Sequence, residues 1–79
     1  MQVTVHYFAV MREQRGLREE SVETATRTAG ELLQELAGRH SFSLEQSRLR
    51  VVVNEEFAEW SRPLREGDAV AFIPPVAGG

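Results

Sequence analysis

Apolar and polar residues alternate at the start of the chain, and this alternation predicts a strand over residues 2–10. Val3, Val5, Tyr7 and Ala9 fall on one side of the pattern, opposite a mostly polar set. A period of two sustained over this length is typical of a half-buried strand. We therefore expect the Val and Tyr side chains to face the core.

The segment after this strand is polar and is predicted to change direction. Residues 11–15 are interpreted as a polar bend that closes on Gly16. Residues 18–25 are polar and only weakly alternating, a pattern typical of an edge strand whose charged side chains discourage pairing with other chains. The first two predicted strands therefore form a hairpin.

A capping box predicts where the main helix begins. The Thr28 hydroxyl can accept a hydrogen bond from an otherwise unpaired N–H, while Glu31 reaches back from three residues further on. The pattern predicts one amphipathic helix of about 11 residues that ends near Gly38. Residues 41–47 are expected to form a loop with a short helical turn. The apolar residues at helical spacing are Leu32, Leu33, Leu36 and Ala37.

The sequence pattern in the last third of the chain predicts three further strands. Residues 49–53 form a nearly unbroken apolar run rich in β-branched side chains, which favours a strand. Residues 54–56 predict a turn, and residues 57–60 a short return strand. A second turn is expected at residues 65–68, with glycine where a positive φ is needed, and residues 69–73 form the last predicted strand.

The order of these elements predicts an α+β fold. A mixed sheet of about four to five strands, with one main helix packed on one face, follows from this order. The first and last strands are expected to be parallel central neighbours, which is the ubiquitin-like β-grasp arrangement. Residues 1–73 then form the domain, and residues 74–79 form an extended C-terminal tail.

The tail carries the most informative residues of the sequence. Pro74 and Pro75 have no N–H for a sheet ladder, so strand structure is expected to end at about Ile73. Gly78 and Gly79 can thread a channel too narrow for larger residues. The terminal carboxylate is an anion at neutral pH and can attack the α-phosphate of ATP. The alternative is an ordinary frayed terminus.

Composition excludes several kinds of protein. The chain has no cysteine, which excludes disulfides, a thiol nucleophile and Cys-based metal sites. No apolar run is long enough to span a membrane, and no signal-peptide pattern begins the sequence, so we expect a cytoplasmic protein without membrane contact. The net charge of −3 argues against nucleic-acid binding. His6 and His40 lack further ligands at metal spacing, so no metal site is expected.

Three segments together resemble a known family. They are residues 7–13, residues 53–57 with 63–68, and residues 72–79. Over essentially the whole chain they are similar to the small subunit of molybdopterin synthase, a sulfur carrier with the ubiquitin-like β-grasp fold. The Asn-Glu and Gly-Asp pairs in the middle are shared with thiamine-pathway carriers. The Phe-Ala-x-x-Arg-Glu segment and the two prolines before Gly-Gly favour the molybdopterin branch.

The resemblance implies that the chain is a non-catalytic cosubstrate of a heteromeric sulfurtransferase. An activating enzyme would adenylate the Gly79 carboxylate with ATP, and a desulfurase or rhodanese-type donor would convert it to a thiocarboxylate. The sulfur would then attack a cyclic pyranopterin phosphate in the large catalytic subunit and form the dithiolene. No cofactor is expected on the chain itself. The tail residues inserted into the partner's active site would be Pro74, Pro75, Val76, Ala77, Gly78 and Gly79.

An exposed apolar patch is the expected contact with these partners. Phe8 lies on the polar side of its strand, and Ile73 should face the same way if the first and last strands are neighbours. Phe57 is expected at the margin of this patch. The alternative is that Phe8 or Phe57 belongs to the core. Arg12 and Glu13 match the family pattern, and they either contact a partner or close the turn.

Other readings of the chain stay open from the sequence. One is a sulfur carrier for thiamine synthesis or tRNA thiolation, and another is a ubiquitin-like modifier that joins lysines of other proteins. A third is a plain interaction domain. All nine basic residues are arginine, so the chain offers no lysine of its own as an acceptor.

Overall fold

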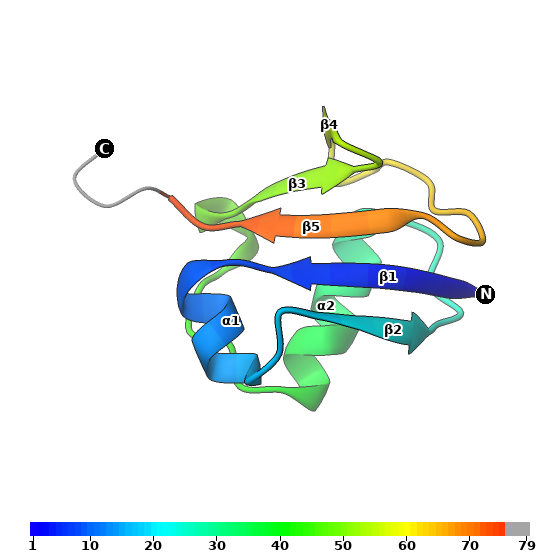
Figure 1. Cartoon of the computed structure of the whole chain (residues 1–79). Coiled ribbons are helices and arrows are strands. Elements are labelled where there is room, and N and C mark those ends of the chain that lie inside the picture. The colour runs from blue at the N-terminus through cyan, green and yellow to red at the C-terminus, as the bar shows by residue number, and fades with distance from the viewer. Residues whose placement is uncertain (76–79) are drawn as a thin grey trace.

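The computed structural model describes residues 1–75, which form one sheet and the helices packed on it (Figure 1). Five strands pair in the order β2-β1-β5-β3-β4. The elements in chain order are β1 (Gln2–Tyr7), α1 (Ala9–Arg15), β2 (Glu19–Glu23), α2 (Ala29–Arg39), the 3-10 helix η1 (Gln46–Arg48), β3 (Arg50–Val53), β4 (Glu56–Ala58) and β5 (Ala69–Ile73).

The first and last strands are the parallel central pair of the sheet. Val5 aligns with Val70, and Tyr7 with Phe72, along β1 and β5. The other neighbouring strands are antiparallel, and β2 and β4 form the two edges. The predicted mixed sheet, its β-grasp topology and the edge position of the second strand are therefore confirmed.

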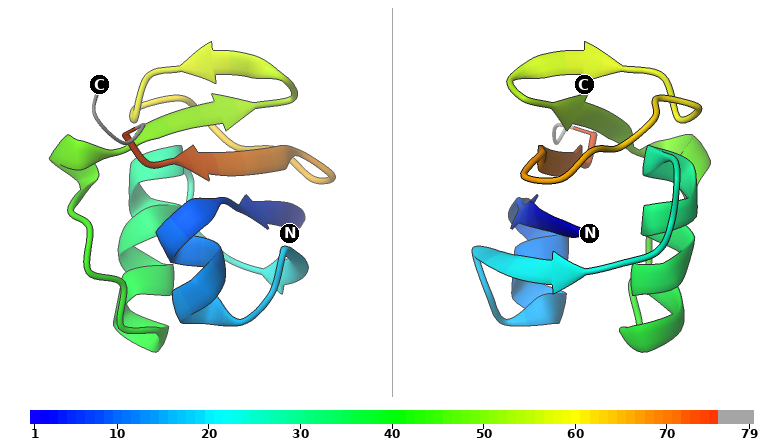
Figure 2. Two further views of the ribbon diagram at one scale, coloured as in Figure 1. Left: turned by 60° about the vertical axis from the view of Figure 1, so that its left-hand side comes forward. Right: turned by 90° about the vertical axis from the view of Figure 1, so that its right-hand side faces the viewer.

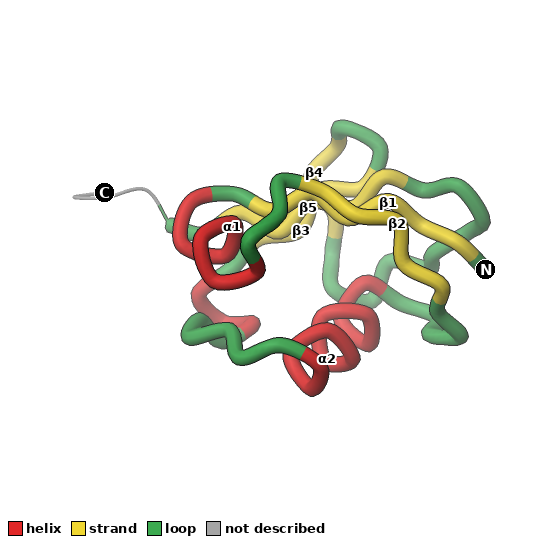
Figure 3. The backbone as a smooth tube through the Cα atoms, turned by 60° about the horizontal axis from the view of Figure 1, so that its bottom comes forward, coloured by secondary structure: helices red, strands yellow, loops and turns green. Residues whose placement is uncertain are grey.

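The core lies between the sheet and α2, which crosses one face of it (Figures 2 and 3). The side chains of Val3, Val5 and Tyr7 are buried, as the alternation predicts. Leu32, Leu33 and Leu36 cover them from the helix. The remaining buried hydrophobic residues are Met11, Val22, Ala29, Leu49, Val51, Val53, Leu64, Val70 and Phe72.

The segment after β1 differs from the prediction. The strand ends at Tyr7, and the expected polar bend is the helix α1. Ala9 enters the helix with φ of +52°, and the Phe8 carbonyl accepts a hydrogen bond from the Met11 N–H at 3.1 Å. Ala9 is exposed and not in the core, while Met11 is fully buried. The predictions of a strand over residues 8–10 and of a polar bend are wrong.

The start of α2 follows the predicted capping chemistry with one change. The Thr28 hydroxyl accepts a hydrogen bond from the Glu31 N–H at 3.2 Å, as expected. The Glu31 carboxylate accepts from the N–H of Arg27 at 2.8 Å, one residue before the predicted partner. The helix runs to Arg39, so Gly38 lies inside it and the predicted stop is one residue early.

Two turns set the direction of the last strands. Asn54 and Glu55 both have positive φ, 51° and 71°, which gives the tight turn between β3 and β4. Gly67 has φ of 85° in the turn before β5, as predicted. The strand β5 ends at Ile73, directly before Pro74, because proline cannot continue the ladder. No helix within residues 1–75 is long and apolar enough to cross a membrane.

Candidate functional site

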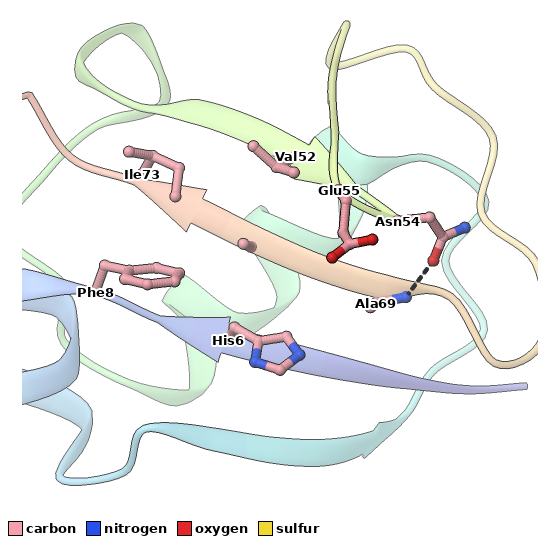
Figure 4. Close-up of a pocket in the computed structure, with 8 residues that line it drawn as sticks. His6, Phe8, Val52, Asn54, Glu55, Ala69 and Ile73 are labelled. Carbon is pink, nitrogen blue, oxygen red and sulfur yellow. Dashed lines mark hydrogen bonds between the residues drawn. The ribbon is translucent and has the colours of Figure 1, made fainter.

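The sheet face that α2 does not cover carries a shallow depression of about 560 Å³ (Figure 4). Its apolar part is formed by Phe8, Val52, Ala71 and Ile73. Ala69 and the polar residues His6, Asn54 and Glu55 line the remainder. The depression therefore lies over the central strands β1, β5 and β3, beside the point where the chain leaves the sheet.

The alternation of β5 explains why this face is apolar. Val70 and Phe72 point into the core and are fully buried, which leaves Ala71 and Ile73 on the opposite face. Phe8 follows β1 with an extended backbone, and its side chain is 46% exposed. The structure thus places Phe8 and Ile73 on the same open face, as predicted from the sequence.

Phe57 lies at the margin of the same face. It is the cross-strand partner of Val52, so the two side chains leave the sheet on the same side. Its side chain is 65% exposed, and the guanidinium carbon of Arg50 lies 4.6 Å from the centre of its ring. Because both Phe8 and Phe57 are exposed, the alternative that either belongs to the core is wrong. Their contact with a partner stays a prediction.

Hydrogen bonds of the Asn54 side chain fix the backbone at the end of the depression that lies farthest from the tail. Asn54 Nδ2 donates to the Asp68 carboxylate at 2.9 Å, and Asn54 Oδ1 accepts from the Ala69 N–H at 2.9 Å. Burial acts to raise the pKa of Asp68, but bonds from Asn54 and the Arg65 N–H, with nearby arginine charges, outweigh it and lower that pKa. These bonds fix the β3–β4 turn against the start of β5.

A second network fixes α1, and with it Phe8, to the edge of the sheet. Arg15 binds the Glu20 carboxylate through two nitrogens, each at 2.8 Å, and the Tyr7 hydroxyl donates to the same carboxylate at 2.6 Å. The Arg15 bonds lower the pKa of Glu20 despite its partial burial. Burial, followed by the bond to Glu20, raises the pKa of Tyr7 well above its ordinary value.

The root of the predicted tail lies at the same end of the sheet as Ile73. Pro74 is buried and Pro75 is exposed. Gly79, the predicted site of the thiocarboxylate, and the predicted tail residues 76–78 before it lie outside the described residues. The described part of the tail therefore begins beside the apolar depression.

Other candidates from the sequence lie apart from this face. Trp60 packs on the core and stacks on Phe72 with ring centres 6.1 Å apart, and Leu64 is buried, so both residues complete the core. Arg12 and Glu13 are exposed on α1. Among residues 1–75, no group of three or more His, Cys, Asp or Glu side chains is placed to hold a metal ion.

The family of the chain follows from comparison with known proteins. The ThiS family matches residues 5–79, nearly the whole sequence. The chain belongs to the ThiS family. The molybdopterin synthase sulfur carrier subunit of Escherichia coli is 36% identical over 80 residues, which cover 98% of this chain and 99% of that protein. The ThiS-family match and this identity place the chain among the molybdopterin synthase sulfur carrier subunits, as the sequence resemblance implies.

Two solved structures share this ThiS-family fold. SAMP1 from Haloferax volcanii superposes with a TM-score of 0.80 at 28% identity, and the match covers 100% of both chains. A complex of subunits 1 and 2 of the molybdopterin-converting factor from Helicobacter pylori contains a chain with a TM-score of 0.71 at 22% identity, again over 100% of both chains. The second likeness shows the fold alone.

Sequence reasoning missed two parts of this site in the ThiS-family chain. One is α1, which supports Phe8. The other is Arg50, whose guanidinium covers the ring of Phe57. The sequence does contain a signal for Arg50. This residue begins a strand two residues before the outward-facing Val52, and alternate residues of a strand share a face.

Proposed function

We propose that this chain carries sulfur as a thiocarboxylate on Gly79 and delivers it to the pyranopterin substrate of a molybdopterin synthase. The full-length match to the sulfur carrier subunits is the observation that carries the proposal. The cysteine-free composition fits it, since a thiocarboxylate holds sulfur on the main chain. The six residues after Ile73 give an arm that begins at the edge of the body.

The carboxylate must be activated before it can take up sulfur. A carboxylate is a poor electrophile, because its oxygen is a poor leaving group. Attack of a Gly79 oxygen on the α-phosphate of ATP releases pyrophosphate and gives an acyl-adenylate. A sulfur nucleophile then displaces AMP, so that a C–S bond replaces the C–O bond to phosphate. The ATP belongs to the activating enzyme, and the chain binds no cofactor of its own.

In this proposal the partners recognise the body of the chain and not the glycines of its tail. Glycine residues offer no side chain for recognition, so a partner must hold the chain elsewhere. The face that contains Phe8, Ile73 and Phe57 is exposed, apolar and adjacent to the root of the tail. In the proposal this face docks in turn on the activating enzyme and on the large catalytic subunit. The tail, residues 74–79, then enters each active site.

The proposed partners are the large subunit, an adenylating enzyme and a sulfur donor of the desulfurase or rhodanese type. The 36% identity to a subunit of the Escherichia coli molybdopterin synthase supports the first of them. The chain supplies the reacting atoms, and the partners supply most of the catalytic groups. It is therefore a cosubstrate that must be recharged after each transfer.

A second candidate function is protein modification. The likeness to SAMP1, a small archaeal modifier protein, favours it. An activated Gly79 attacked by a lysine amine would give an isopeptide in place of a thiocarboxylate. This chain has no lysine, so the acceptors would be other proteins. Sulfur carriage for thiamine synthesis or tRNA thiolation would share the activation chemistry and differ in the acceptor.

Mass spectrometry of the protein isolated from its own cells tests the proposal. We expect a fraction of the chain to carry sulfur in place of one terminal oxygen, located by fragmentation on Gly79. Conjugates on lysines of other proteins, without any thiocarboxylate, would instead establish the modifier function. A chain found with neither modification under conditions of molybdenum cofactor synthesis would contradict both.

A further inference from the structure

Arg50 is a cation at the margin of the apolar face, next to Phe57 and Ile73. It begins β3 and is the cross-strand partner of Ile73, the last residue of β5. It is exposed, and its side chain leaves the sheet on the same side as Val52, two residues later. The guanidinium therefore lies where the body meets the root of the tail.

The ring of Phe57 holds this guanidinium over the face. The distance of 4.6 Å between the guanidinium carbon and the ring centre is within the range of a cation–π interaction. No ion pair joins Arg50 to a carboxylate within residues 1–75. The charge is thus positioned by an aromatic ring but not neutralised by the described part of its own chain.

The charged groups at the two ends of the depression differ in sign. The Glu55 side chain lies over the depression near Ala69, where β5 begins, while Ile73 lies at the other end (Figure 4). Arg50 is the cross-strand partner of Ile73, so it lies at that end as well. A complementary surface therefore needs an acidic group near the tail and an apolar centre. The acidic group would lie beside the opening that admits the tail.

Docking of a partner on this face would also change the surroundings of the Arg50 charge. A partner that covers Phe8, Ile73 and Phe57 also removes water from the guanidinium next to them. A buried cation without a partner costs several kcal/mol, whereas a hydrogen-bonded carboxylate offsets that cost and adds a directional contact. A planar guanidinium placed over an aromatic ring can still donate its N–H groups to a carboxylate.

We propose that the large catalytic subunit places an Asp or Glu carboxylate against Arg50, at the mouth of the channel that receives the tail. This inference rests on the proposed function and names the chemistry of that partner's surface. The ion pair fixes the rotation of the body on its partner, because it lies off the apolar centre of the contact. It thereby aligns the tail with the channel.

Binding of the purified large subunit to Arg50→Gln tests the inference, with Arg27→Gln as the matched control. Both substitutions remove one positive charge. Arg27 is exposed and lies just before α2. Within residues 1–75 it forms hydrogen bonds only through its backbone, from its N–H to Glu31 and from the Leu64 N–H to its carbonyl. We expect Arg50→Gln to weaken binding about tenfold or more, and Arg27→Gln to leave it within about twofold. Added salt should weaken the wild-type complex more steeply than the Arg50→Gln complex.

Arg50→Leu separates the proposed ion pair from an apolar contact. With a carboxylate opposite, leucine should bind at least as weakly as glutamine, and Arg50→Lys should recover part of the affinity. Leucine binding as tightly as wild type, or Arg50→Gln matching the Arg27→Gln control, would overturn the inference. A wild-type chain that did not bind the large subunit would instead contradict the proposed function. Thermal unfolding of each variant verifies that the fold is intact.

Discussion

At the scale of single residues, the proposed docking depends most on the side chain of Phe8. It is nearly half exposed on the open face, beside the root of the tail and in line with Ile73. A large exposed apolar side chain in such a patch marks an interaction surface. Its neighbours Ala71 and Val52 are smaller, so we expect Phe8 to be the principal anchor of the proposed docking surface.

Phe8→Arg should weaken binding of the large subunit at least tenfold and leave stability within about 0.5 kcal/mol. The ring makes its expected contacts with the partner and not with the core. Leu17→Arg is the matched control, since Leu17 is 40% exposed in the loop after α1 and does not line the depression. Isothermal titration and urea unfolding measure the two quantities. Unchanged binding with a large loss of stability would reverse the assignment of Phe8.

Glu20 gives a prediction about pH. Its pKa is held below the ordinary value of 4.5, chiefly by the bonds from Arg15. The stabilisation is complete above that value and is lost as pH falls through the lowered pKa, because protonation removes the charge that Arg15 binds. Asp68, whose pKa is also lowered, acts in the same direction.

Glu20→Gln should lower the free energy of unfolding by about 1–3 kcal/mol at pH 7, where it removes a charged bidentate pair. The difference from wild type should narrow as the pH is lowered below the ordinary Glu pKa of 4.5, because the wild-type carboxylate is then protonated. Urea unfolding across this range measures both curves. A difference that widened as the pH was lowered below 4.5 would contradict the assignment, because it would mean that the pKa of Glu20 is not lowered by folding.

At the scale of elements, α1 is the part of the fold that supports Phe8. Tyr7 and Phe8 connect it directly to β1, and Arg15 ties its other end to β2 through Glu20. Gln14 and Ser43 join it to the loop after α2 through two hydrogen bonds, of 2.8 and 3.1 Å. The short helix is thus fixed at several points.

Met11→Ala should destabilise the protein by about 2–4 kcal/mol, since Met11 is fully buried and its removal leaves a cavity. Glu13→Ala, an exposed change in the same helix, should stay within about 0.5 kcal/mol. Chemical denaturation compares the two variants. Equal, small effects would mean that α1 does not pack as described.

The sequence predicts the sheet and α2 well because their periodicity is long and regular. The alternation in β1 and β5 and the leucine spacing in α2 each repeat over several residues, so one misread position changes little. The turn glycine Gly67 and the end of β5 at Pro74 follow from the backbone limits of single residue types. These are local rules that tertiary contacts rarely override.

The sequence could not predict α1, because only Met11 of its seven residues is buried. One buried residue gives no helical period, and Ala9 continues the alternation of β1 past the true end of the strand at Tyr7. The candidate site can likewise be predicted only in part from the sequence. Phe8 and Ile73 follow from strand alternation, whereas the cover of Arg50 over Phe57 depends on pairing between β3 and β4.

At the scale of the whole molecule, the body and the tail have separate roles in the proposed function. The body, residues 1–73, contributes a five-stranded sheet whose open face is the proposed docking surface. The tail, residues 74–79, contributes the proposed reacting group. Changes in the tail should therefore alter sulfur transfer while leaving the fold of the body unchanged, because the described core contains no tail residue beyond Pro74.

Transfer of sulfur from the purified, thiocarboxylated chain to cyclic pyranopterin phosphate on the large subunit is the most direct measurement. We expect dithiolene product in proportion to the thiocarboxylate supplied. We expect none from a chain that lacks Gly79 or carries a bulky residue at Gly78, although both variants should unfold at the wild-type temperature. Product formation by the chain without Gly79, at a rate near wild type, would contradict the account.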